Sequence, residues 1–114
     1  MKYAVLIYGR EDRDTFGALS EEQQQAIMGE YVALSELPTT VGGAQLQPGA
    51  TATTVHVEDG EMLLTDGPYA ETKEVLGGFY LIDVDDLDEA LDFASKVPAA
   101  KRGGLVEVRP LVER

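Results

Sequence analysis

The chain has 114 residues, of which 21 are Asp or Glu and 9 are Lys or Arg, so its formal net charge at neutral pH is -12. An extended phosphate-binding surface needs clustered Lys and Arg, so this composition argues against nucleic acid as a partner. With no cysteine, the chain can form no disulfide framework, thiolate metal site or thiol nucleophile, which suits a cytoplasmic protein. No run approaches the ~20 apolar residues that cross a bilayer, so no membrane association is expected. The length predicts one domain, residues 1–114, with one core.

The first predicted element is a strand from Tyr3 to Tyr8, an unbroken apolar run typical of the centre of a sheet. Ser20 and Gln23 then form a capping box that opens a helix over residues 21–36, and Leu37-Pro38 ends it.

A short outer strand is predicted over residues 40–46, where Gly42-Gly43 weakens it locally. Two β-rich runs, residues 51–57 and 61–65, follow on either side of Asp59-Gly60. This dipeptide fits a two-residue type I′ hairpin, because both of its positions need positive φ.

The second long apolar run, residues 76–84, predicts another central strand. Asp86 and Glu89 form a capping box for a second helix that ends before Val97-Pro98. A last strand is predicted over residues 105–109.

The predicted order is strand, helix, strand, hairpin, strand, helix, strand. This is an α+β fold of the ferredoxin-like type, with two split βαβ units and an inserted hairpin between them. Two helices can cover only one face of such a sheet, so the other face of the central strands is left without a cover. A second copy of the sheet is the simplest cover, and we expect a homodimer.

The densest group of special residues is Asp66-Gly67-Pro68-Tyr69-Ala70-Glu71-Thr72-Lys73-Glu74. The Asp-Gly-Pro segment is typical of a turn, and the polar residues after it are too close together to pack in a core. One interpretation is a solvated loop. The other is a catalytic site, in which Asp66 and Glu71 act as general acid or base and Lys73 holds an anion or stabilises an enolate.

This stretch, followed by Gly77-Gly78-Phe79-Tyr80, resembles the marker of the DGPF branch of the YCII-related family of small bacterial proteins. The marker reads Asp-Gly-Pro-Phe-Ala-Glu-Thr-Lys-Glu before a Gly-Gly-aromatic strand, and Tyr69 stands here in place of the usual Phe. The resemblance implies a dimeric α+β barrel, in which two sheets meet face to face, and a biochemical role that is largely undefined. It also implies a possible extracytoplasmic-function sigma factor as a partner, since members are often encoded near one or fused to one.

Ligand-binding candidates lie in and around the same stretch. Gly78 leaves room in its strand for a ligand or for a neighbouring backbone. Tyr8 and Tyr80 could direct their hydroxyls into one cavity, or they could simply pack. The candidate ligand-binding residues are Tyr8, Gly67, Tyr69, Thr72, Gly78 and Tyr80.

No metal site or cofactor is predicted. His56 is the only histidine and is interpreted as an ordinary strand residue of the hairpin. Other YCII-related branches use a His-Asp pair, but no residue here matches that histidine in position. The acidic residues near the second helix lack the spacing of an EF-hand loop, and the helix N-terminus explains them.

Three hypotheses of function remain open. The first is a small-molecule-binding protein of undefined substrate, either a binder or an enzyme of the isomerase or lyase type by analogy with other dimeric α+β barrels. The second is a regulatory binding module associated with a sigma factor. The third is an interaction protein in which the marker loop only closes the dimer.

Overall fold

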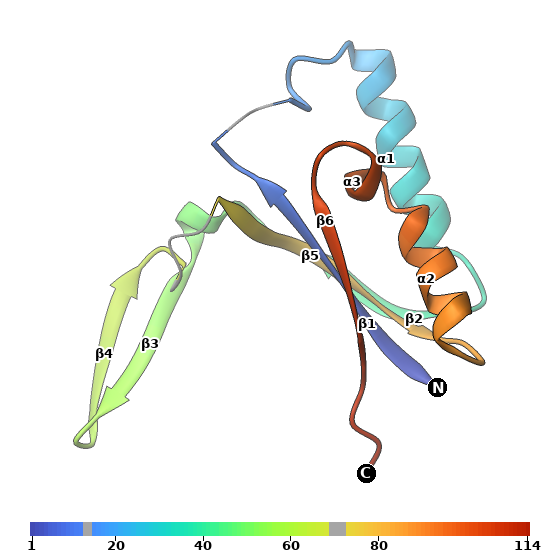
Figure 1. Cartoon of the computed structure of the whole chain (residues 1–114). Coiled ribbons are helices and arrows are strands. Elements are labelled where there is room, and N and C mark those ends of the chain that lie inside the picture. Colours follow the sequence, from blue (N-terminus) through green and yellow to red (C-terminus); the bar gives the residue numbers. More distant parts are fainter. Residues whose placement is uncertain (13–14, 69–72) are drawn as a thin grey trace.

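The computed structural model describes residues 1–12, 15–68 and 73–114, and its elements follow the predicted order (Figure 1). Two short elements, η1 and α3, were not predicted. Pro98 ends the second helix as expected, but it also occupies the first turn of α3, where a proline is well tolerated. The elements are β1 (Lys2–Arg10), α1 (Glu21–Ser35), β2 (Thr40–Gln45), η1 (Gly49–Thr51), β3 (Thr53–Glu58), β4 (Glu61–Asp66), β5 (Glu74–Asp83), α2 (Leu87–Ser95), α3 (Pro98–Lys101) and β6 (Leu105–Pro110).

The four-stranded sheet has the order β2-β5-β1-β6, with antiparallel pairing throughout. The two most apolar runs of the sequence, β1 and β5, are its central strands, and β2 is an edge strand. These three predictions are confirmed, and the order is that of a ferredoxin-like sheet.

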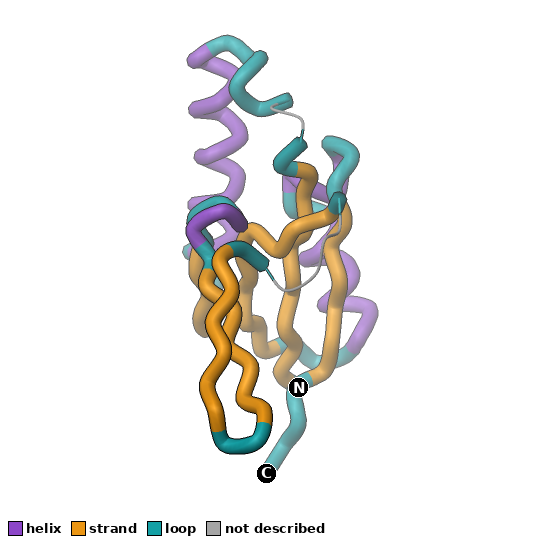
Figure 2. Tube along the Cα trace, turned by 90° about the vertical axis from the view of Figure 1, so that its left-hand side faces the viewer, coloured by secondary structure: helices purple, strands orange, loops and turns teal. Residues whose placement is uncertain are grey.

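Helices α1 and α2 lie on one side of the sheet, and the hairpin of β3 and β4 lies on the other (Figures 1 and 2). The core forms between the sheet and the helices. Tyr80 of β5 packs edge to face against Phe93 of α2, with ring centroids 5.4 Å apart. The buried apolar residues are Tyr3, Val5, Leu34, Tyr80, Ile82, Val84, Ala90, Phe93, Ala94 and Val97.

The opposite side of the sheet, here called the open face, has no helix over it. Side chains alternate along a strand, so the neighbours of the core residues point this way. The register pairs Leu6 with Phe79 and Ala4 with Leu81, which places these four side chains together on the open face. Each of them is partly exposed.

Local signals at the helix starts behave nearly as predicted. Ser20 and Gln23 form the full capping box, with both hydrogen bonds at 3.1 Å. Asp86 accepts a hydrogen bond from the backbone N–H of Glu89 at 2.9 Å. The return bond differs by one residue, because the Glu89 carboxylate accepts from the backbone N–H of Asp85.

The hairpin of β3 and β4 is a separate two-stranded sheet that projects away from the body. Asp59 and Gly60 at its turn have φ of 51° and 80°, so the prediction of a type I′ turn is confirmed. The projection makes the molecule extended. Its radius of gyration is 16.0 Å, whereas a compact chain of this length would have roughly 13 Å.

Within the part of the chain that the structure describes, no helix is both long enough and apolar enough to cross a membrane.

Candidate functional site

The marker stretch connects the hairpin to the central strand β5. Asp66 is the last residue of β4, Lys73 directly precedes β5, and both side chains are exposed. Tyr69, Glu71 and Thr72 of the predicted site lie outside the described residues. The described residue Lys73 lies at the end of the sheet where β1 finishes and β5 begins.

Gly67 forms the turn that the sequence predicts. Its φ is +93°, a backbone conformation that favours glycine. Its N–H donates to the carbonyl oxygen of Ala52 at 2.7 Å, and its own carbonyl oxygen accepts from the Thr54 hydroxyl at 2.8 Å. The turn is therefore tied to the start of β3.

We expect Gly67→Val to lower the free energy of unfolding by more than about 1 kcal/mol, because a branched side chain disfavours positive φ. An added Cβ would meet no atom within 4 Å, so the cost comes from the backbone alone. The matched control is Gly9→Val, since Gly9 has equally open space but no positive φ. Equal urea midpoints for the two variants would contradict this assignment.

Gly49 packs between the end of the sheet and Pro68, the residue that follows the Gly67 turn. Its N–H donates to both carboxylate oxygens of Glu11, at 2.8 and 3.1 Å. A Cβ at Gly49 would lie 3.2 Å from a Glu11 oxygen, 3.2 Å from Val75 and 3.6 Å from Pro68. Residues distant in sequence are therefore packed together here, and Gly49 is buried among them.

Charged side chains gather at the same end. Arg10 is paired in register with Glu74, and its guanidinium forms hydrogen bonds with the Asp12 carboxylate. The hydrogen bond to Asp12 raises the pKa of Arg10 above its usual value, with the charge of Glu74 acting in the same direction. We call Arg10, Glu11, Gly49, Pro68, Lys73 and Glu74 the loop-end cluster.

Sequence reasoning missed Arg10, Glu11 and Gly49 as members of this cluster. A signal was present, because the charged residues at positions 10–14 directly follow the first central strand. Antiparallel neighbours bring the end of one strand beside the start of the next, so Arg10 meets Glu74, the residue that opens β5.

Tyr8 and Tyr80 do not share a cavity, which corrects the pairing considered from the sequence. Tyr80 is opposite Val5 and belongs to the core, where its hydroxyl donates to the backbone carbonyl oxygen of Tyr31 at 2.7 Å. Burial raises the pKa of Tyr80, so the hydroxyl keeps its proton for this bond. By strand alternation Tyr8 lies on the open face instead.

Gly78 is explained by packing between strands. A Cβ there would lie 3.0 Å from the carbonyl oxygen of Ala44, in the neighbouring edge strand β2. Of the two interpretations given to Gly78, the structure favours close approach of a backbone.

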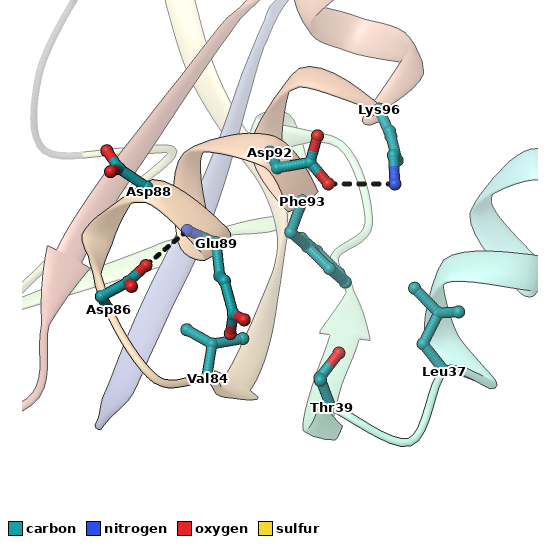
Figure 3. Close-up of a pocket in the computed structure, with 9 residues that line it drawn as sticks. All are labelled: Leu37, Thr39, Val84, Asp86, Asp88, Glu89, Asp92, Phe93 and Lys96. Carbon is teal, nitrogen blue, oxygen red and sulfur yellow. Dashed lines mark hydrogen bonds and ion pairs between the residues drawn. The ribbon is translucent and has the colours of Figure 1, made fainter.

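A cavity of about 480 Å³ lies at the opposite end of the sheet, between α2 and the segment that leads into β2 (Figure 3). The ten residues of β5 separate it from the marker stretch, a distance of roughly 30 Å at the usual rise of a strand. The marker residues therefore cannot reach it. Its lining residues are Leu37, Thr39, Val84, Asp86, Asp88, Glu89, Asp92, Phe93 and Lys96.

Several acidic residues near α2 have structural partners. Asp86 caps α2, Asp92 pairs with Lys96 at 3.1 Å, and Asp83 accepts from the N-terminal amine at 3.3 Å. Among the described residues, no group of three or more histidine or acidic side chains is arranged to hold a metal ion. His56 is exposed on the hairpin.

Comparison with known proteins identifies the family of this chain. The model of the YCII-related domain matches residues 1–114. The chain belongs to the YCII-related family. It is also 43% identical, over 116 residues, to the uncharacterized protein R00369 of Rhizobium meliloti (strain 1021), covering 97% of this chain and 92% of that relative. Membership of the YCII-related family establishes the kind of domain but does not identify a substrate.

Proposed function

We propose that this YCII-related protein binds a small oxygenated molecule with an anionic group at the loop-end cluster. The observation that carries the proposal is the gathering of cations and carboxylates around the glycine contact at Gly49, beside the open face. The exposed Lys73 supplies positive charge for an anion, and it adjoins Glu74, the register partner of Arg10. The Gly67 turn does not need the charged side chains of the loop-end cluster in order to form.

The catalytic version of this proposal is an isomerase or lyase. Asp66 and Glu71 would act as general acid and base, and Lys73 would stabilise the negative charge of an enolate. Carboxylates are suited to this work where an apolar surface lowers the local dielectric constant. The open face supplies such a surface, through Leu6 and Phe79.

We further propose that a second copy covers the open face, so that the binding site lies between two sheets as in a dimeric α+β barrel. Partly exposed apolar side chains on β1 and β5 support this arrangement. Light scattering at micromolar concentration should give twice the chain mass of 12.3 kDa. A particle of one chain mass would contradict the dimer.

Lys73→Ala should abolish or strongly weaken ligand binding while leaving the melting temperature of the free protein within a few degrees, because an exposed lysine contributes little to stability. The first step is a thermal-shift screen with small hydroxy- and keto-carboxylates, since a ligand of the native state raises its apparent stability. The control is Lys2→Ala, since Lys2 is also an exposed lysine and lies at the far end of β1.

Two outcomes would contradict this role. Equal affinity of both lysine variants for the compound found in the screen would exclude Lys73 from the site. A collapsed melting temperature of the Lys73→Ala variant, with affinity intact in the folded fraction, would make Lys73 a structural residue.

The alternative function is a regulatory binding module for an extracytoplasmic-function sigma factor. The cavity at α2 favours it, because four acidic residues line it together with the apolar side chain of Phe93: Asp86, Asp88, Glu89 and Asp92. A basic peptide segment would complement this cavity. Binding of a fluorescent Lys- and Arg-rich peptide that falls with salt and is weakened by Asp88→Asn would support this function over the first one.

A further inference from the structure

The hairpin has one apolar and one polar face, and both are exposed to solvent. Register pairs Val55 with Leu64 and Val57 with Met62, so these four side chains project from the same face. Their exposed fractions range from 57% to 65%. We call residues 53–66 the arm and these four side chains its apolar face.

The other face of the arm is mainly polar. It carries Thr54, Thr65, His56 and the two acids next to the turn, with Leu63 as its large apolar side chain. A hairpin surrounded by water on both sides would not need one apolar and one polar face. The alternation of apolar and polar faces is typical of a hairpin that packs one side against another surface.

The arm does not use this face within its own chain. Every residue from Val55 to Asp66 is exposed, and the arm diverges from the sheet (Figure 1). A two-stranded hairpin without further packing is marginally stable in water. Packing of the apolar face against another surface would therefore stabilise the arm.

We propose that the apolar face of each arm packs on a second copy of the chain. The chain presents two uncovered apolar surfaces, the open face and the apolar face of the arm, and the arm lies on the side of the sheet away from the helices (Figures 1 and 2). In a pair related by a two-fold axis, each copy offers both surfaces to its partner, so both can be covered by one assembly. This inference rests on the homodimer proposed above and adds the arm to its interface.

The consequence for the site is direct. Asp66 stands at the base of the arm, on the same side of the ribbon as Leu64, and the marker stretch begins immediately after it. An arm held against a partner fixes the position of Asp66 relative to that partner. The loop-end cluster would therefore reach its binding geometry only in the dimer.

The charge of the chain favours an apolar contact over a polar one. Each copy carries a formal net charge of -12, so two copies repel each other at long range. The apolar face carries no ionisable side chain among its four residues. Raising the salt concentration should screen the repulsion and strengthen the dimer.

The test compares Leu64→Glu with Leu63→Glu by sedimentation equilibrium. The two residues are adjacent in β4 and point to opposite faces, so the substitutions match in residue type, added charge and strand. Because each variant occurs twice in a dimer, Leu64→Glu should raise the dissociation constant at least ~100-fold, while Leu63→Glu should change it no more than about threefold. Circular dichroism checks that the body stays folded in both.

A second measurement reports the contact directly. The chain has no cysteine, so Val57→Cys and His56→Cys variants can each be labelled at one position with an environment-sensitive dye. The emission of the dye at position 57 should shift to the blue as the concentration rises through dimer formation, and that of the dye at position 56 should not.

The outcomes separate the two proposals. If the wild-type protein is monomeric at all concentrations, the proposed dimer and the proposed arm contact are both overturned. If it is dimeric and Leu64→Glu dissociates no more than Leu63→Glu, the arm contact alone is overturned. An unchanged dye spectrum at position 57 across dimer formation has the same meaning.

Discussion

Ile82→Ala is expected to lower the free energy of unfolding by about 2–5 kcal/mol, as for large-to-small changes in other cores. Ile82 is fully buried in the middle of the core between the sheet and the helices. Removing most of its side chain loses apolar burial and leaves a cavity that the neighbouring strands can close only in part. Urea denaturation followed by circular dichroism measures the change.

Leu81→Ala is the matched control, because Leu81 is next to Ile82 in β5, has a side chain of the same composition and lies on the open face. Its effect on one isolated copy should be smaller, since its side chain is partly exposed there. If a second copy covers the open face, its cost should grow with protein concentration. A loss for Ile82→Ala no larger than that for Leu81→Ala in a dilute sample would contradict the assignment of the core.

Gly43→Ala should destabilise the protein by about 1–3 kcal/mol, the usual cost of a residue held in an unfavourable backbone conformation, with a steric term in addition. Gly43 has φ of +148° beside the register shift between β2 and β5. A Cβ there would lie 2.5 Å from the carbonyl oxygen of Phe79 and 3.1 Å from the Cα of Tyr80. Backbone atoms cannot move away as a flexible side chain can.

The same substitution at Gly29 should have the opposite sign. Gly29 lies in α1 with no atom within 4 Å of the added Cβ. Alanine should stabilise the helix there by about 0.5–1 kcal/mol, because it loses less conformational entropy than glycine. Equal changes in the melting temperature of the two Gly→Ala variants would contradict the close approach at Gly43.

The fold could be predicted because its main signals are local. The two long apolar runs, the Ser20 cap and the Asp59-Gly60 turn each act over a few residues, and they agree with one topology. The short helix α3 was missed because Pro98 marks both the end of one helix and the start of the next.

The site could be predicted only in part. The turn at Gly67 follows from its neighbours in the sequence, and the structure bears it out. The packing of Glu11 against Gly49 could not be predicted in this way, because it joins segments 38 positions apart. The sequence leaves open whether Tyr8 and Tyr80 share a cavity or simply pack, and only their register in the paired strands shows that they lie on opposite faces.

The free arm also bears on the solubility of the protein. A two-stranded ribbon has two edges with unpaired backbone groups, and such edges recruit strands of other molecules into aggregates. Glu58, Asp59 and Glu61 surround the tip of the arm, and acids in such places act as gatekeepers against this pairing. As the pH falls toward the isoelectric point near 4.2, the chain loses the repulsion that its charge provides. The solution should then become turbid and show a β-rich infrared signal, because the arms pair with one another while the helix-covered core remains folded.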